Sequence, residues 1–164
     1  MSNITLGGTP ISTKGEFPKV GDKLPNFRLI KSDLSELTNE DLKGKKVVFN
    51  IFPSVDTDVC AMQLGQFSNK LKDREDVALV FASMDLPFAL KRFCGDKGIE
   101  NAVTTSDFRH KSIANNGIEM ADGALAGLYA RGVMVTDENG TITYSELCKD
   151  IVDEPNYEAA IKEL

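Results

Sequence analysis

Hydrophobic residues follow two different patterns along the first half of the chain. The segments KKVVFNIFP (residues 45–53) and DVALVFASMD (76–85) are largely apolar runs of strand length, which is typical of strands buried on both faces. Between them, apolar side chains recur at steps of three and four residues, at Cys60, Leu64, Phe67 and Leu71. This spacing predicts a helix that begins at Thr57. The pattern therefore indicates a strand, a crossover helix and a second strand.

Turn residues and shorter β-rich segments divide the rest of the chain. Gly-Gly and Asn-Gly steps within β-rich runs predict hairpins, and a proline at a first helical position predicts a helix start. The expected elements are a hairpin over 4–12, an extended piece over 27–30, a helical turn within 35–45, a helix from Pro87 to about Cys94, a strand over 102–107, a helix over 108–117, a hairpin over 131–147 and a helix over 156–164. Alternating strands and helices predict an α/β fold, with a central mixed β-sheet flanked by helices and an N-terminal β-hairpin.

Length and composition narrow the class of protein. The chain has 164 residues, which is the size of one ordinary domain, so we expect residues 1–164 to form a single unit. Its formal net charge is −6 and its basic residues are scattered, which argues against nucleic acid as a partner. No apolar run approaches the ~20 residues of a membrane span, and the N-terminus lacks the pattern of a secretory signal peptide.

The chain contains three cysteines, Cys60, Cys94 and Cys148, with a single histidine and no C-x-x-C motif. Zinc-binding spacing is absent, so no metal and no other cofactor is expected. A secreted disulfide scaffold would be smaller and richer in cysteine. The cysteines are therefore expected to serve either as small buried residues or in redox chemistry.

The stretch FPSVDTDVC (residues 52–60) lies where the first buried strand meets the helix. Open α/β sheets place their functional sites at this end of a strand. With Thr57 as the N-cap, its hydroxyl is expected to accept a hydrogen bond from the N–H of residue 60. Cys60 then lies in the first helical turn, where free N–H groups and the helix dipole favour a thiolate.

Two carboxylates oppose this effect. Asp56 and Asp58 are close to Cys60 in the sequence, and negative charges disfavour a neighbouring thiolate. A reactive Cys60 therefore requires that both carboxylates face solvent or that a buried cation outweighs them. Spacing alone leaves two interpretations of Cys60 open: a reactive thiolate, or a packed residue at the start of the apolar face of its helix.

The same stretch resembles a known family. Pro53, Thr57 and Cys60 fit the P-x-x-x-T-x-x-C signature of the peroxiredoxins, which are thiol peroxidases with a thioredoxin-like fold. Four segments in the right order are similar to the bacterial thiol peroxidases of the atypical two-cysteine type: NIFPSVDTDVCAMQ, DLPFALKRFCG, GALAGLYARGVMVTDENG and EPNYEAAI. The resemblance covers nearly the whole chain and implies a thioredoxin-like fold.

The resemblance also implies roles for five residues. Cys60 would be the peroxidatic cysteine, Pro53 would shield its thiolate, and Thr57 would bond the peroxide oxygens and the sulfur. Arg131 matches the family's active-site arginine and would supply the required cation. Cys94 would be the resolving cysteine, since the position five residues after Cys60, where another subfamily has it, is glycine.

The implied function is the reduction of hydrogen peroxide and alkyl hydroperoxides in antioxidant defence. Cys60 would become a sulfenic acid and condense with Cys94 to an intramolecular disulfide, which thioredoxin would reduce. Because a disulfide needs Cα atoms within about 7 Å, we expect residues 57–65 and 88–98 to unwind locally on oxidation. The resemblance further implies a homodimer packed near the active-site loops. The cytoplasm is the expected compartment, with the periplasm as the alternative.

Three other hypotheses stay open. The protein would be a redox sensor if oxidised Cys60 or Cys94 signalled to a partner without turnover. A non-catalytic thioredoxin-like binding module is disfavoured because Pro53, Thr57 and Arg131 are all present. A single-cysteine peroxidase, in which Cys94 is only structural, is the nearest mechanistic variant.

The remaining candidate residues are given structural roles. Cys148 is interpreted as a packing residue, because cysteine is not part of the family pattern at that position. His110 lies outside every catalytic pattern and is expected at the surface of a charged helix. Phe88 and Phe93 flank Cys94 and are expected to be core or dimer contacts.

Overall fold

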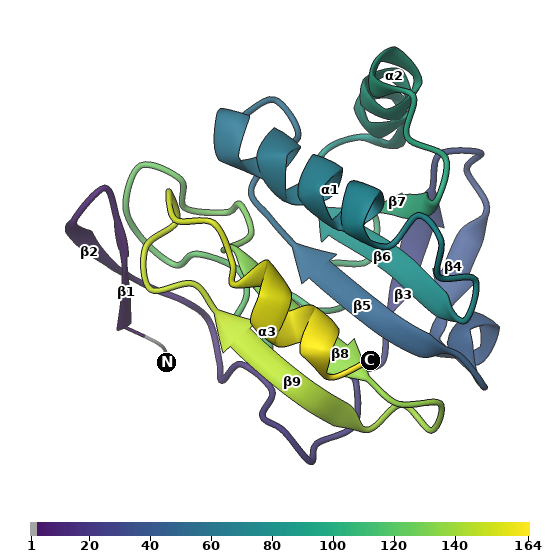
Figure 1. Cartoon of the computed structure of the whole chain (residues 1–164). Coiled ribbons are helices and arrows are strands. Elements are labelled where there is room, and N and C mark those ends of the chain that lie inside the picture. Colours follow the sequence, from purple (N-terminus) through teal and green to yellow (C-terminus); the bar gives the residue numbers. More distant parts are fainter. Residues whose placement is uncertain (1–2) are drawn as a thin grey trace.

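A seven-stranded mixed sheet forms the centre of the molecule (Figure 1). The structure is a computed structural model that describes residues 3–164. The sheet consists of β3 (Arg28–Lys31), β4 (Glu36–Thr38), β5 (Lys46–Ile51), β6 (Val77–Ser83), β7 (Ala102–Ser106), β8 (Gly132–Thr136) and β9 (Ile142–Leu147), in the spatial order β4-β3-β7-β6-β5-β8-β9. The β5–β6 and β6–β7 pairs are parallel, and the other pairs are antiparallel. The predicted mixed sheet is confirmed.

Within residues 3–164, three α-helices and one short 3₁₀ helix accompany the sheet. They are α1 (Asp58–Lys70), α2 (Pro87–Lys97), α3 (Tyr157–Lys162) and η1 (Asn39–Leu42). The N-terminal strands β1 (Asn3–Leu6) and β2 (Thr9–Ser12) form a separate two-stranded hairpin, as predicted. The helix α1 follows β5 and leads to the parallel strand β6, which is the strand, helix and strand unit expected from the hydrophobic pattern.

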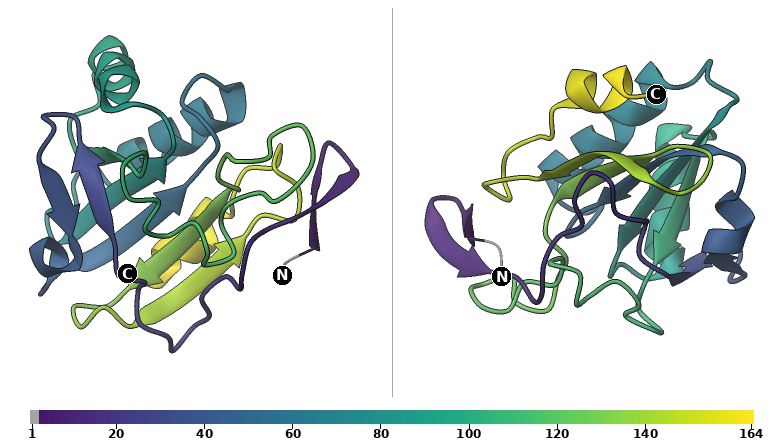
Figure 2. Two further views of the ribbon diagram at one scale, coloured as in Figure 1. Left: turned by 180° about the vertical axis from the view of Figure 1, so that it is seen from behind. Right: turned by 90° about the horizontal axis from the view of Figure 1, so that it is seen from below.

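Both faces of the sheet are covered, but by different kinds of structure (Figure 2). The three α-helices lie on one face, where Val48 and Phe81 of the sheet pack with Leu64 of α1 in one hydrophobic cluster. On the opposite face, Val47 and Phe49 pack against irregular chain from residues 17–27 and 113–129. Successive residues of β5 therefore contribute to opposite clusters, which explains why this strand is an almost continuous apolar run.

The prediction of a helix over residues 108–117 is wrong. This segment consists of turns, and Lys111 has a φ of +48°, which an α-helix does not accommodate. The buried carboxylate of Asp107 accepts hydrogen bonds from the N–H groups of Ser112 (2.9 Å) and Ile113 (3.1 Å). It also accepts one from the hydroxyl of Tyr129 at 2.6 Å. The side chain thus takes the N–H groups that a helix would need, which is how aspartate competes with helix formation.

Candidate functional site

The end of β5 and the start of α1 meet at a buried cysteine. The strand ends at Ile51, and α1 begins at Asp58 with Thr57 as its N-cap, as predicted. Cys60 is the third residue of the helix, and its side chain is fully buried within the cluster on the helical face of the sheet. The helix therefore presents the sulfur from its first turn, among N–H groups that have no partner within the helix.

The predicted capping bond from the Thr57 hydroxyl is wrong. Thr57 accepts no side-chain bond from its helix; its hydroxyl donates instead to the Ser54 carbonyl oxygen at 3.0 Å. The Thr57 N–H donates to the same oxygen at 3.2 Å. A tight turn over residues 54–57 places this carbonyl beside Thr57, so the hydroxyl closes the turn rather than capping the helix. The Thr57 side chain is exposed.

The Cys60 sulfur receives two hydrogen bonds. Nη1 of Arg131 lies 3.2 Å from Sγ, and the Ser54 N–H lies 3.5 Å from it. Both groups are donors, and one carries a full positive charge, so both stabilise a thiolate over a thiol. The structure thus brings together Cys60 and the arginine that the sequence pattern named, although 71 positions separate them.

Arg131 is the buried cation that the neighbouring aspartates made necessary. It directly precedes β8 and is 2% exposed. Its Nε donates to the Ile151 carbonyl at 2.7 Å, and Nη1 also donates to Oε1 of Gln63 at 3.0 Å. The side chains of Asp56 and Asp58 are exposed, as expected for a reactive Cys60. Water therefore screens their charges, whereas the guanidinium acts at contact distance.

A carboxylate just after the neighbouring strand β6 holds the loop before Cys60. Asp85 follows β6 and accepts hydrogen bonds from the Ser54 hydroxyl at 2.6 Å and the Val55 N–H at 2.9 Å. The Ser83 hydroxyl donates to the same carboxylate at 2.8 Å. Pro53, predicted to shield the thiolate, is buried in this loop. The loop is therefore held by β5 at its start and by Asp85 at Ser54 and Val55.

Sequence reasoning assigned no role to Asp85, Gln63 or Asn50. A signal for each of them was available in the sequence. Asp85 follows the parallel neighbour of β5, so the two strands end at the same edge of the sheet. Asn50 is polar within a nearly continuous apolar strand, and Gln63 lies three residues after Cys60 on the same helix face.

Cys94, the expected resolving cysteine, lies outside this hydrogen-bond network. It is half-buried on α2, and its thiol donates to the Thr104 hydroxyl of β7 over 3.8 Å. Burial raises the pKa of the Cys94 thiol, so the reduced side chain is held as a thiol. Cys60 and Cys94 are both free cysteines in this state.

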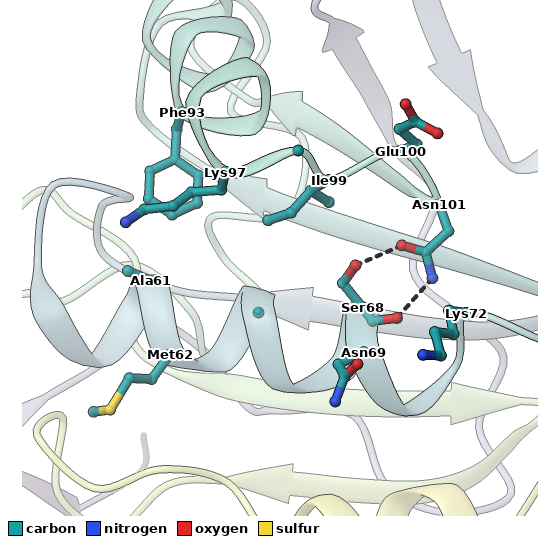
Figure 3. A pocket seen from close by; sticks show the side chains of 12 residues that line it. Ala61, Met62, Ser68, Asn69, Lys72, Phe93, Lys97, Ile99, Glu100 and Asn101 are labelled. Carbon is teal, nitrogen blue, oxygen red and sulfur yellow. Dashed lines mark hydrogen bonds between the residues drawn. The ribbon is translucent and has the colours of Figure 1, made fainter.

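A groove of about 690 Å³ separates α2 from α1 (Figure 3). Phe93 and Lys97 of α2 project into it toward Ala61 of α1. At its far end, Ser68 of α1 bonds to Asn101 through two hydrogen bonds of 2.5 and 2.9 Å. Cys94 does not line this groove and lies instead in a separate hollow with Lys91 and Thr104.

The remaining candidates keep largely structural roles. Cys148 is buried, and burial together with the nearby Glu146 carboxylate raises its pKa to about 12, which suits a packed thiol. Phe88 is 65% exposed, so the core position considered for it is wrong, whereas Phe93 packs partly against the helical-face cluster. His110 is exposed, as expected, but in a turn, with Nε2 3.2 Å from a Glu36 oxygen.

Within residues 3–164, no group of three histidine, cysteine or acidic side chains is arranged to hold a metal ion. Nor does any helix among these residues have the length and apolar character needed to cross a membrane.

Comparison with known proteins connects this geometry to one family. The family pattern described as Redoxin matches residues 19–161. The chain is 46% identical over 162 residues to the thiol peroxidase of Vibrio cholerae, covering 98% of this chain and 99% of the relative. It is 44% identical over 164 residues to the thiol peroxidase of Mycobacterium tuberculosis, covering 100% and 99% of the two chains.

A solved structure gives the same result for the fold. The peroxiredoxin-like protein of Aquifex aeolicus superimposes with a TM-score of 0.93 at 36% identity, over 99% of this chain and 96% of that one. The predicted thioredoxin-like fold is therefore confirmed. The chain belongs to the Redoxin family and, within it, to the thiol peroxidases.

Proposed function

We propose that this enzyme reduces hydrogen peroxide and alkyl hydroperoxides at Cys60. The contact of 3.2 Å between buried Arg131 and the Cys60 sulfur carries the proposal. The thiolate attacks one peroxide oxygen, a new S–O bond forms and the O–O bond breaks. The leaving oxygen takes a proton and departs as water or an alcohol. Cys60 is oxidised to a sulfenic acid and the peroxide is reduced.

Arg131 and Thr57 are proposed to act on the peroxide. The leaving oxygen gains negative charge as the O–O bond breaks, so donors aimed at it lower the barrier. Arg131 already points at the sulfur, and the exposed Thr57 hydroxyl needs only to turn from the Ser54 carbonyl toward an incoming peroxide. Pro53 is proposed to keep water from the thiolate.

Cys94 is proposed to resolve the sulfenic acid. Its thiol sulfur attacks the Cys60 sulfur, water leaves, and an intramolecular disulfide forms. Since the thiol is directed to Thr104 of β7, α2 must rearrange before the two sulfurs can bond. A dithiol reductant, for which we propose thioredoxin, then restores both thiols by exchange.

We further propose that the protein works as a homodimer in the cytoplasm, for antioxidant defence. Leu86 and Phe88, at the start of α2, expose 53% and 65% of their surfaces close to the active-site loop. Exposed apolar side chains grouped beside a site favour contact with another protein. Sedimentation of the reduced parent and of a Phe88→Glu variant would test the dimer. The parent should sediment as a dimer, and the variant should dissociate into monomers more readily.

Peroxide consumption with thioredoxin, thioredoxin reductase and NADPH tests the function. The parent should turn over, Cys60→Ser should be inactive, and Cys94→Ser should react once without recycling. Cys148→Ser is the control and should match the parent. Continued turnover by Cys94→Ser would instead indicate a single-cysteine mechanism. A parent that consumes no peroxide would refute the proposed function and favour the redox sensor.

A further inference from the structure

Gln63 is a buried polar residue that directly contacts the cation of the site. It lies on α1, three residues after Cys60, and is fully buried. A buried amide has to find hydrogen-bond partners, because leaving it unpaired costs free energy. Its partners are Arg131 on one side and Asn50, in the centre of β5, on the other.

The hydrogen bonds along this chain have a fixed direction. The amide nitrogen of Asn50 is placed to donate to the Val48 and Val80 carbonyls at 3.4 and 3.3 Å. Its Oδ1 accepts from Nε2 of Gln63 at 3.1 Å. Oε1 of Gln63 is then left for Nη1 of Arg131, at 3.0 Å. A guanidinium can only donate, so the anchored amide of Asn50 sets Gln63 in the orientation that Arg131 requires.

All of these partners are neutral. Nε of Arg131 donates to the Ile151 carbonyl, which is also uncharged. None of the ion pairs found among residues 3–164 involves Arg131. A buried cation is costly without a compensating negative charge. The Cys60 sulfur, at 3.2 Å, is the contacting group that provides one on ionisation.

We propose that Gln63, oriented by Asn50, is a positioning residue that holds Nη1 of Arg131 against the Cys60 sulfur without neutralising the guanidinium. A carboxylate of the same length at this position would hold the arginine equally well. It would also compete with the thiolate for the positive charge. The neutral amide therefore separates the two tasks of placing the cation and leaving its charge for Cys60. This inference deepens the proposed peroxidase function and rests on it.

The first test changes charge at constant shape. Gln63→Glu replaces the amide by a carboxylate, and Gln66→Glu is the control, because Gln66 is an exposed residue of the same helix. Alkylation of Cys60 by iodoacetamide is followed by peptide mass spectrometry as a function of pH. Gln63→Glu should raise the pH midpoint of alkylation by about one to three units, the usual effect of a contacting charge. Equal midpoints in the two variants would overturn the proposal.

The second test removes the acceptor without adding charge. In Gln63→Met, Nη1 of Arg131 loses one anchor but the guanidinium keeps its charge. The midpoint should stay close to that of the parent, while the rate constant for peroxide falls about tenfold, since small misplacements of reacting groups are costly. A midpoint shifted as far as in Gln63→Glu would overturn the role of charge. An unchanged peroxide rate would overturn the role in positioning.

The two readouts keep the two proposals apart. Alkylation needs no peroxide and no reductant, so it reports on Cys60 whether or not the protein is a peroxidase. A shifted midpoint in Gln63→Glu, found in a protein that consumes no peroxide, would refute the proposed function and support the arrangement of Gln63 and Arg131.

Discussion

Arg131 shows how much of this site depends on one side chain. Its guanidinium contacts the Cys60 sulfur, the Gln63 amide and a backbone carbonyl, and it is almost completely buried. A lysine could carry the same charge but lacks the planar fork that makes these three bonds at once. The geometry of the donor, as well as its charge, is therefore expected to matter for catalysis.

Replacing Arg131 by lysine should lower the second-order rate constant for peroxide by roughly a hundredfold, the effect of losing one well-placed donor. Stopped-flow measurement of the sulfenic acid step in single turnovers would check this. Arg92→Lys is the matched control, because Arg92 is exposed and pairs with exposed Asp56 at 3.2 Å. Surface pairs of this kind contribute little, so the control should retain the parent rate. A rate within threefold of the parent for Arg131→Lys would contradict the role of the fork.

Two glycines of helix α2 have opposite effects on its tendency to unwind. Its last turn closes on Gly98, which has a φ of +66° and follows the left-handed pattern of a glycine C-cap. The groove beside it leaves space between α2 and α1. Gly95 lies inside the helix next to Cys94, where glycine weakens the helical conformation relative to alanine. Gly98 therefore stabilises the end of α2, whereas Gly95 weakens the interior of the same helix.

Replacing Gly95 and replacing Gly98 by alanine should have opposite effects on stability and on the rate of disulfide formation. Gly95→Ala should stabilise the reduced protein by about 0.5 to 1 kcal/mol, because no heavy atom lies within 4 Å of the added Cβ. It should also slow disulfide formation about threefold if α2 unwinds first. Gly98→Ala should destabilise by about 1 kcal/mol because of its positive φ, and should speed disulfide formation. Urea unfolding and rapid-quench thiol labelling measure the two effects. If both variants form the disulfide at the same rate as the parent, unwinding of α2 does not limit disulfide formation.

At the scale of the whole molecule, the Asp150 carboxylate is one of several groups that join the separate N-terminal hairpin to the rest of the chain, together with backbone hydrogen bonds of Thr5 and the packing of Ile4. Asp150 accepts hydrogen bonds from the Thr5 hydroxyl at 2.6 Å and from the N–H groups of Gly7 and Gly8 at 3.0 and 2.9 Å. These bonds, with one from Val152, hold the pKa of Asp150 well below its usual range. The ionised form is thus the one that docks β1 and β2 against the chain that follows β9.

Docking of the hairpin should therefore depend on pH. A carboxylate with a lowered pKa stabilises the folded state above its unfolded pKa of about 4, and this contribution is lost as the pH falls further. Hydrogen exchange in residues 3–12 should accelerate below that pH, before exchange in β5 changes. Asp150→Asn should cause the same loosening at neutral pH, whereas Asp153→Asn, an exposed residue of the same segment, should not. Equal exchange in the two variants would contradict the role of Asp150.

The order of elements could be predicted from the sequence because the signals are local. Continuous apolar runs, three- and four-residue steps, and Gly or Pro at element ends each depend on neighbouring residues. The Pro53, Thr57 and Cys60 motif was likewise visible, since one loop carries it. The expected helix over 108–117 failed because Asp107 bonds to N–H groups of that segment and to Tyr129, which lies beyond it.

The family resemblance named Arg131 as the cation, but only tertiary structure could decide its contact with the Cys60 sulfur and what holds both groups in place. Asp85 reaches the loop before Cys60 from a segment far along the chain, and the chain of hydrogen bonds through Asn50 and Gln63 exists only once β5 and α1 are packed. Local sequence predicts most of the helices and strands and supplies the chemical groups that are available. The charge, burial and partners of a side chain are set by what the fold places next to it, because Coulomb energy and desolvation depend on distance in space rather than on separation along the chain.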